Sequence, residues 1–518
     1  MRRERAERAG YLDRVVAVLV ALILVAALAI VARPLPALFD QPLEEDGYYY
    51  MAIARWIALG HGVTYDGQSL SNGFQPLWAF LCAPFFWLVD GDRVAGIRYA
   101  LALHWIFYAL GALITSALFA RITDKSPVGS LSGKVIAALV FLSSPFIWSN
   151  SFNGLETSLS TACLLLSVLC YVSIDQKNRV HLAGCSVALG FAVLARIDTV
   201  IFVIMLAGAQ LIRQGSLKER IVNAACLSVP AALVSSPWWA YNVIVFGHLT
   251  PISGLALQDW APTPKRYATS ATAFIASITS QFDWFWSADT WPRALARVPI
   301  IGLAIYWLWP ELRAIFRALD RSVVEVLSVL ALFVVFLAVW YPSSSWASFF
   351  YSRYFAPASV LGVLFWSLVI LKIVERVHRN VAIVGLSIVA AQIPVLVALN
   401  YSGPLRQALL LGQVSLAKEY VPADDWVAGV QSGTLGFHRD RVANLDGRVN
   451  FAALQRRHDL EGYLRDTGIR WIVDRSWILE AFLGRGFDKR GWTPVASRAG
   501  VTLYHYDESK IEPDASRK

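Results

Sequence analysis

Three acidic residues, Glu44, Glu45 and Asp46, stand together directly after the first long apolar segment of the chain. Three tyrosines follow at once, and then the Gly-rich turn HGVTYDG and the polar cluster SNGFQPLW. A carboxylate there could be solvated or could cap a helix, but the surrounding aromatic and amide side chains favour a chemical role. It could accept the proton of an acceptor hydroxyl or orient that hydroxyl. Asp46 and Glu45 are therefore the candidate catalytic residues.

Polar side chains elsewhere in the chain could bind a substrate beside these acids. Amide groups and an indole ring offer donors, acceptors and a stacking face that suit a sugar. An arginine near a membrane interface suits phosphate oxygens. The candidate substrate-binding residues are Tyr49, Asn72, Gln75, Trp78, Glu156, Arg196, Asp198, Arg353 and Tyr354.

Several of these candidates have plain structural alternatives. Asn72 begins an Asn-Gly turn signal, Glu156 could be the first-turn acid of a helix, and Arg353 could anchor the chain at a membrane interface. Arg196 and Asp198 interrupt an apolar run, where ionisable residues are costly and are usually paired or functional. Because residues two positions apart do not share a helix face, we expect a helix break or separate partners there rather than a local pair.

The elements that position these residues are membrane spans, to judge from composition. Of the 518 residues, 56% are hydrophobic and only 16% are charged, and the mean hydropathy is +0.50. Soluble domains carry more charge than this. The net charge of +9 fits lysines and arginines on the cytoplasmic side of a membrane better than a nucleic-acid partner. The fold class is therefore a polytopic α-helical membrane protein in a lipid bilayer.

Apolar runs of span length recur from residue 15 to residue 400. The run at 76–89 is short and holds Pro84, so it could be a short span or a re-entrant helix. Without it the count is about 11 spans. The basic residues between runs place the N-terminus in the cytoplasm and export the tail. The predicted organisation is a transmembrane catalytic module at 1–400, with a first extracytoplasmic loop at 33–76 and a long loop at 241–296, followed by an extracytoplasmic α/β domain at 401–518.

No cofactor is expected from the sequence. All five cysteines lie in apolar stretches, which is typical of buried small residues and not of a disulfide framework or a metal site. His61 and His248 lack metal-ligand spacing to other histidines or cysteines. A divalent metal is conceivable, but the sequence does not support one. The glycines of AGVQSGTLG in the tail do not have the spacing of a dinucleotide fingerprint.

The segment EEDGYYYMAIARWIALGHGVTYDGQSLSNGFQPLW resembles the first extracytoplasmic loop of bacterial GT-C-type glycosyltransferases. In many of those the loop reads like DDAYYY–IARN–G-G-TFDG–TNGFHPLW. Later stretches that are similar to landmarks of the group are NGLET (153–157), LARID (194–198), PWWAYNVIVFG (237–247), RYFAP (353–357), GTLGF (433–437) and NLDGRVN (444–450). The resemblance covers most of the chain.

The resemblance implies an integral enzyme of the bacterial cytoplasmic (inner) membrane with a GT-C-like fold. Such an enzyme takes a hexose or pentose from a polyprenyl-phosphate donor on the outer face, and its acceptor is an envelope glycan, a lipid or a protein. The catalytic carboxylate of the group corresponds to Asp46. Glu45 replaces the first Asp of the commoner pair, and Gln75 stands where His is common, which weakens a proton-donating role for that position.

Two other functions compete with the glycosyltransferase interpretation. A transporter or flippase for a lipid-linked or small polar substrate would need polar residues at the bilayer midplane and internal repeats, whereas polarity here concentrates in the expected outer loops and the tail. A non-catalytic scaffold for envelope assembly would leave the acids at 44–46 unexplained.

Overall fold

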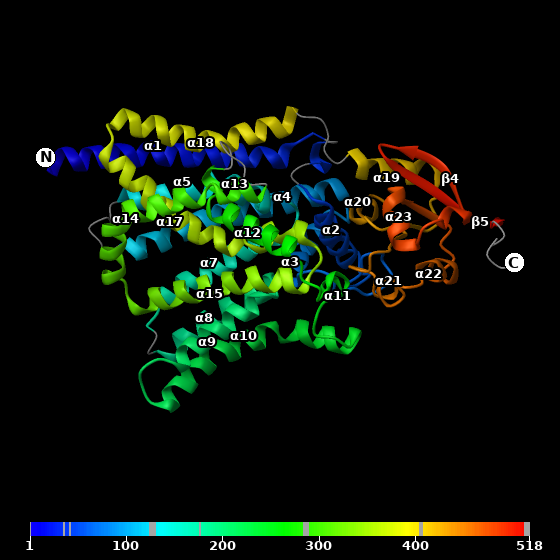
Figure 1. Ribbon diagram of the computed structural model, residues 1–518, viewed down its shortest axis with the longest axis horizontal. Helices are drawn as coiled ribbons and strands as arrows, with labels where there is room; N and C mark the ends of the chain where they lie inside the picture. The colour runs from blue at the N-terminus through cyan, green and yellow to red at the C-terminus, as the bar shows by residue number, and fades with distance from the viewer. Residues whose placement is uncertain are drawn as a thin grey trace.

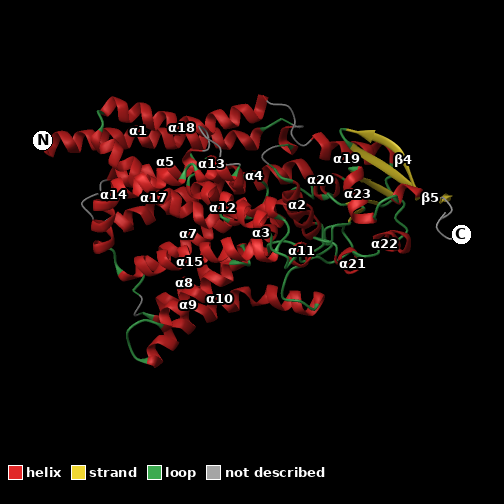
Figure 2. Ribbon diagram, in the orientation of Figure 1, coloured by secondary structure: helices red, strands yellow, loops and turns green. Residues whose placement is uncertain are grey.

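Helices form most of the chain, and the described strands lie in its C-terminal part (Figure 2). The computed structural model describes residues 2–34, 37–40, 43–123, 131–175, 178–282, 290–402 and 408–511. Small parts of the predicted loops 33–76 and 241–296 and of the predicted tail domain 401–518 lie outside these ranges. A helical bundle and a small mixed domain lie at opposite ends of the molecule (Figure 1).

The helices of the bundle follow the apolar runs of the sequence. They are α1 (Arg2–Leu28), α2 (Glu45–Ala58), α3 (Pro76–Leu88), α4 (Arg93–Thr123), α5 (Leu131–Leu142), α6 (Pro145–Ser151), α7 (Thr157–Ser173), α8 (Arg179–Ala195), α9 (Thr199–Leu211), α10 (Leu217–Phe246), α11 (Ile252–Leu257), α12 (Pro264–Ile278), α13 (Trp291–Leu295), α14 (Val298–Ala318), α15 (Arg321–Ser344), α16 (Tyr351–Tyr354), α17 (Ala356–Arg376) and α18 (Arg379–Ser402).

Seven helical segments among the described residues are long and apolar enough to cross a membrane. They are Gly10–Ala32, Arg93–Thr123, Leu217–Phe246, Trp291–Ala318, Arg321–Ser344, Ala356–Arg376 and Arg379–Ala398. Shorter apolar helices, α3 and α7 to α9 among them, lie in the same bundle. The predicted polytopic α-helical class is confirmed, while the predicted number of spans stays a prediction.

Helix packing brings distant parts of the chain together. The N-terminal α1 runs beside α18, from the other end of the bundle sequence, and both lie along one edge of the molecule (Figure 1). The helix α8 packs along α10, and α4 packs against α5 and α7. The predicted loop at 241–296 is largely helical: α10 continues to Phe246, and α11, α12 and α13 follow.

The tail forms a small α/β domain, as predicted. It consists of α19 (Ala408–Tyr420), β1 (Val427–Gly429), α20 (Gly433–His438), β2 (Val442–Asn444), α21 (Phe451–Gln455), α22 (Leu460–Asp466), β3 (Trp471–Asp474), α23 (Ser476–Leu483), β4 (Arg490–Arg498) and β5 (Val501–Ile511). The strand order is β2-β1-β3-β5-β4. The pairs β1–β2 and β1–β3 are parallel, and β3–β5 and β5–β4 are antiparallel. In this sheet order the ends of β1 and β2 carry the two loops that reach the bundle.

Candidate active site

A cavity of about 500 Å³ lies where the first loop, the helices α9, α10 and α15, and the tail domain meet. Its polar lining includes Asp46, Glu156, Arg196, Arg353 and Arg448. These residues come from five separate segments of the chain. The cavity therefore collects most of the charged candidates that the sequence singled out, together with one arginine that it did not.

Asp46 sits between two arginines in this cavity. Its Oδ2 accepts a hydrogen bond from Nη1 of Arg353 at 3.0 Å, and its Oδ1 accepts one from Nη1 of Arg448 at 3.1 Å. The Asp46 side chain is 13% exposed, so water screens these pairs only weakly. The carboxylate is thus held in place by charge-assisted hydrogen bonds from both sides while it lines the cavity.

The two arginines of this cluster are held in fixed positions. The guanidinium of Arg353 lies 4.0 Å from the ring centroid of Phe350, and that of Arg448 lies 5.1 Å from the same ring. Arg448 also pairs with Asp446 at 3.1 Å. Burial by itself lowers the pKa of Arg448, but the carboxylates of Asp446 and Asp46 raise it by more. Both guanidiniums therefore present permanent positive charge to the cavity.

Glu45 faces the tail domain, and it does not line the cavity. Its carboxylate accepts hydrogen bonds from the backbone N–H of Gly433 at 2.5 Å and from the hydroxyl of Thr434 at 2.7 Å. Burial raises the pKa of Glu45 to about 7, although these donors act in the opposite direction. The expected catalytic pair is thus divided: Asp46 faces the cavity, and Glu45 fastens the first loop to the tail.

The tail approaches the first loop so closely that two contact positions accept only glycine. A Cβ at Gly73 would lie 1.7 Å from the carbonyl oxygen of Arg448, and a Cβ at Gly433 would lie 2.3 Å from that of Glu45. Tyr49 adds to the contact, because its hydroxyl accepts hydrogen bonds from Ser432 N–H and from Asn444 Nδ2. These contacts between the tail and the first loop place Arg448 next to Asp46.

A second charged cluster lines the cavity at the break between α8 and α9. Arg196 pairs with Glu156 at 2.9 Å and with Asp198 at 2.9 Å, and Tyr341 donates a hydrogen bond to Asp198 at 2.5 Å. The predicted helix break is confirmed, because α8 ends at Ala195 and α9 begins at Thr199. The expectation against a local pair is wrong: in the extended conformation of Arg196 the two side chains two positions apart meet.

Tyr50 and Gln75 connect these parts of the site. The Tyr50 hydroxyl donates to Glu156 at 2.8 Å and accepts a hydrogen bond from the backbone N–H of Gln75 at 3.1 Å. The side chain of Gln75 accepts from Ile197 N–H at 2.9 Å. Gln75 therefore lines the cavity while it fixes the backbone between Arg196 and Asp198.

Tyr354 completes the wall between the two charged clusters. Its ring stacks on that of Tyr341 with the centroids 3.9 Å apart, and the Arg196 guanidinium lies 4.8 Å from the Tyr354 centroid. The neighbouring residue, Arg353, pairs with Asp46 in the other cluster. The RYFAP stretch thus supplies one side chain to each cluster.

Asn72 and Trp78 lie behind the cavity wall, with 0% exposure. Asn72 donates to Asn242 of α10 at 3.0 Å and accepts from Ile252 N–H at 3.0 Å, so it fixes α11 on the bundle. Trp78 donates to the carbonyl oxygen of Gly154 at 2.9 Å and thereby holds the turn that carries Glu156. The structure places both residues where they support the site, and neither presents a free face to a sugar.

Most of the remaining lining of the cavity is apolar, although Thr250 and Ser253 also belong to it. The apolar part includes Val200 and Ile201 of α9, Trp239 of α10, and Phe336 and Trp340 of α15. The helices α10 and α15 are candidate membrane spans. The same cavity thus has both a charged region and apolar walls formed by candidate membrane spans.

Nothing in the described residues groups three or more His, Cys, Asp or Glu side chains in the manner of a metal site. The positive charge near Asp46 comes from the two guanidiniums.

No protein-family model matches the chain, and no curated protein sequence matches it either. Several solved structures, in contrast, match the chain. The crystal structure of ArnT from Cupriavidus metallidurans in the apo state matches with a TM-score of 0.60 over 96% of this chain and 99% of that chain, at 12% identity. ArnT bound to undecaprenyl phosphate gives a TM-score of 0.59 at the same identity and coverage. This is a GT-C fold.

A larger archaeal protein also has a similar fold. The oligosaccharyltransferase AglB from Archaeoglobus fulgidus, in complex with an inhibitory peptide and a dolichol-phosphate, matches with a TM-score of 0.50 at 12% identity. The match covers 96% of this chain and 75% of that chain. The fold expected from the first-loop resemblance is therefore confirmed over nearly the whole chain.

Three residues of the site, Arg448, Tyr341 and Tyr50, are not among the candidates that the sequence predicts. Arg448 stands alone as a cation within NLDGRVN, and Tyr341 lies at the end of an apolar run. The signal in the sequence that points to Arg448 is its charge, because a cation in the tail can pair with the acids of the first loop.

Proposed function

We propose that the chain is a glycosyltransferase that moves a sugar from a polyprenyl-phosphate donor to an envelope glycan, lipid or protein. The observation that carries this proposal is the position of Asp46, held between Arg353 and Arg448 at the charged part of a cavity whose other walls are mostly apolar. A base, two cations for a phosphate and an apolar wall suit a lipid-linked phosphosugar. A protein of the same fold, ArnT, binds undecaprenyl phosphate.

The donor is proposed to lie along the cavity with its two ends in different surroundings. The prenyl chain packs against Trp239, Phe336 and Trp340, and the phosphate lies against Arg353 and Arg448. Arg196 is a weaker candidate for the phosphate, because its side chain is only 5% exposed, against 13% for Arg353 and 16% for Arg448. The sugar then extends toward Glu156, Gln75 and Tyr354, with its anomeric carbon between the phosphate and an acceptor hydroxyl that faces Asp46.

The proposed reaction is a direct displacement at the anomeric carbon. The acceptor hydroxyl gives its proton to Asp46 while its oxygen forms a bond to the anomeric carbon. The bond between that carbon and the phosphate oxygen breaks, and the electron pair leaves with polyprenyl phosphate. Arg353 and Arg448 stabilise the charge that develops on this leaving group, which is the stage at which preorganised cations contribute most. Glu45 acts on the reaction through the tail domain.

No resident cofactor is proposed for this step. The two guanidiniums next to Asp46 supply positive charge where the leaving phosphate would lie. Transfer by purified protein should continue at its normal rate in excess EDTA. A loss of transfer that Mg²⁺ or Mn²⁺ restores would show that a divalent ion takes part.

The proposed location is the bacterial cytoplasmic membrane, with the N-terminus in the cytoplasm and the tail domain on the outer face. The basic links, such as that at Lys372–Arg379, then lie inside. A reporter fused after Asn400 that is active only outside the cytoplasm tests this orientation. Activity of a cytoplasm-specific reporter at the same position would reverse it.

The experiment that tests the function compares envelope glycans of a deletion strain with those of the wild type. The strain should lack one sugar on a glycan, lipid or protein, and the wild-type gene should restore it. The Asp46→Asn gene should not restore it, although its product is inserted in the membrane. An unchanged envelope profile, together with altered uptake or export of a solute, would instead favour a transporter.

A further inference from the structure

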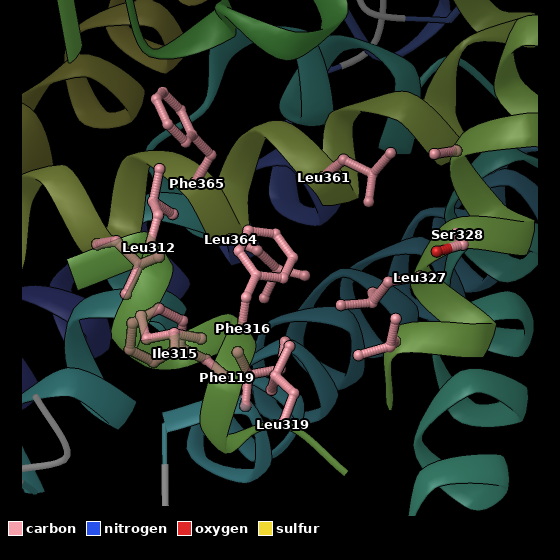
Figure 3. Close-up of a pocket in the computed structure, with 14 residues that line it drawn as sticks. Phe119, Leu312, Ile315, Phe316, Leu319, Leu327, Ser328, Leu361, Leu364 and Phe365 are labelled. Atoms are coloured by element: carbon pink, nitrogen blue, oxygen red, sulfur yellow. The ribbon is translucent and has the colours of Figure 1, made fainter. Parts of the chain in front are cut away.

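A second cavity, of about 320 Å³, lies between α4, α14, α15 and α17. Figure 3 shows Phe316, Leu364 and Leu327 around it, and the hydroxyl of Ser328 is the polar group among its 14 lining side chains. Its volume is more than twice that of the apolar cavity of about 150 Å³ that takes up benzene in a well-studied protein. An apolar space of this size is unfavourable for water and favourable for hydrocarbon.

This cavity opens on the outer surface of the bundle. Phe316 is 62% exposed and Val324 is 39% exposed, and both line the cavity. The candidate span Trp291–Ala318, which contains α14, is peripheral, since only 17% of its apolar stretch is buried. A side opening between α14 and α15, both candidate spans, meets lipid chains in a bilayer.

One side of the second cavity lies far from the tail domain. Arg93, at the start of α4, contacts Asp440 of the tail domain at 2.7 Å, whereas the cavity is lined by Phe119 near the end of the same helix. These residues are 26 positions apart, or roughly 39 Å at 1.5 Å per residue. The other side of the cavity is closer to the active site, because Ala331 of α15 lines this cavity and Phe336, five positions along the same helix, lines the Asp46 cavity.

Basic side chains lie where the cavity opens. Arg317 directly follows Phe316, and Arg321 lies one helical turn before Val324. Both arginines are exposed, and within the described ranges neither has an ion-pair partner. The segment 313–321 carries three arginines against one acid, Asp320.

Three other basic groups near this cavity already have partners. Lys372 pairs with Glu311 at 2.6 Å, Arg376 lies 5.2 Å from the Trp307 ring, and Arg313 lies 4.8 Å from the Trp309 ring. Among the described residues, Arg317 and Arg321 are thus exposed cations next to the mouth, and Arg121, between the lining residues Phe119 and Ile122, is a third exposed cation near the cavity.

We propose that this cavity binds an anionic phospholipid, with one acyl chain inside it and the phosphate against Arg317 and Arg321. A basic recess between span helices is a recognised setting for anionic headgroups. The site is independent of the glycosyltransferase proposal, because it shares no lining residue with the Asp46 cavity.

Native mass spectrometry of the purified full-length protein, titrated with dioleoylphosphatidylglycerol or dioleoylphosphatidylcholine, tests the proposal. The anionic lipid should bind more tightly, and the double variant Arg317→Gln/Arg321→Gln should weaken its binding about 30-fold, at about tenfold per 1.4 kcal/mol and about 1 kcal/mol for each cation. The charge-matched control Arg179→Gln/Lys218→Gln, at exposed positions of the same end, should bind like the wild type.

A second variant tests the cavity itself. Ser328→Phe places a ring at the cavity wall and should reduce binding of both lipids. Equal affinity for the two lipids, equal losses in the test and control double variants, or unchanged binding by Ser328→Phe would each overturn the proposal. Displacement of the bound lipid by undecaprenyl phosphate would also overturn it, because the cavity would then belong to the donor.

Discussion

Arg448 and Asp46 are 402 positions apart in the sequence, yet Nη1 of Arg448 lies 3.1 Å from Oδ1 of Asp46. The tail domain thus supplies one of the two cations that hold the candidate base, and α16 supplies the other through Arg353. This arrangement makes the tail domain part of the catalytic centre in the proposed mechanism. It also makes the first loop depend on a domain at the other end of the chain.

Arg448→Gln should lower kcat/KM for the donor by about 10-fold to 150-fold. A hydrogen bond to a charged group contributes about 1.5–3 kcal/mol, and a factor of ten corresponds to about 1.4 kcal/mol. The measurement is transfer kinetics with a defined polyprenyl-phosphate sugar. Arg441→Gln, an exposed tail arginine paired with Asp424, is the matched control and should behave like the wild type. Equal kinetics for both variants would remove Arg448 from the site.

Arg353→Ala should impair use of the donor more than use of the acceptor. The guanidinium lies where the phosphate is proposed to bind, whereas a neutral acceptor hydroxyl gains little from it. Initial rates measured while each substrate is varied separate the two KM values. Equal changes in both KM values, or none, would contradict the phosphate clamp.

Arg196→Ala should act mainly on stability. Its removal leaves the buried Glu156 and the half-buried Asp198 without their cation, and breaking a buried pair in this way costs about 3–5 kcal/mol. Thermal unfolding in detergent should show a clearly lower Tm for this variant than for Arg353→Ala. A wild-type Tm combined with lost donor binding would instead assign the phosphate to Arg196.

The raised pKa of Glu45 predicts that the stability of the contact between the first loop and the tail depends on pH. Its pKa in the folded protein is raised from 4.5 to about 7, so the folded state binds the proton more tightly than the unfolded state does. The stabilisation that this proton gives is complete below about pH 4.5 and is lost as the pH rises toward 7. The Tm difference between wild type and Glu45→Gln should therefore become smaller or change sign across this interval. A difference that does not vary with pH would show that Glu45 has its ordinary pKa.

Gly73→Ala should abolish transfer while the bundle stays folded. The new methyl group would overlap the carbonyl oxygen of Arg448, at 1.7 Å, so the tail must move away from Asp46. Gly184→Ala is the control, since no atom lies within 4 Å of its added Cβ and alanine is the better helix former. Helical circular dichroism should be equal for the two variants, and only Gly184→Ala should keep activity. Full activity of Gly73→Ala would refute the requirement for close docking.

Local patterns in the sequence predicted much of this fold. The apolar runs gave α8 and α9, and the pair Arg196 and Asp198 marked the break between them because charged groups are costly inside a span. The strand pattern RWIVD became β3. The long loop was less predictable, since α12 is amphipathic and carries no continuous apolar run.

The site was only partly predictable, because its contacts join segments that are remote in sequence. Asp46 and Arg353 could be proposed from residue type and expected side of the membrane, but nothing local ties Arg448 to them. Asn72 and Trp78 have the chemistry of sugar-binding residues, yet packing against Asn242 and Gly154 uses their polar groups. Residue type alone does not distinguish a cavity wall from the layer behind it.

The most direct test of the central claim is transfer by Asp46→Asn with a defined polyprenyl-phosphate sugar and acceptor. The variant is nearly isosteric and should stay folded and inserted, but its amide cannot take the acceptor's proton, so the rate should fall by at least about 10²–10⁴-fold. Glu156→Gln, measured beside it, should retain more activity. Near-normal transfer by Asp46→Asn together with loss of transfer by Glu156→Gln would contradict the account and move the catalytic carboxylate to the turn at 153–157.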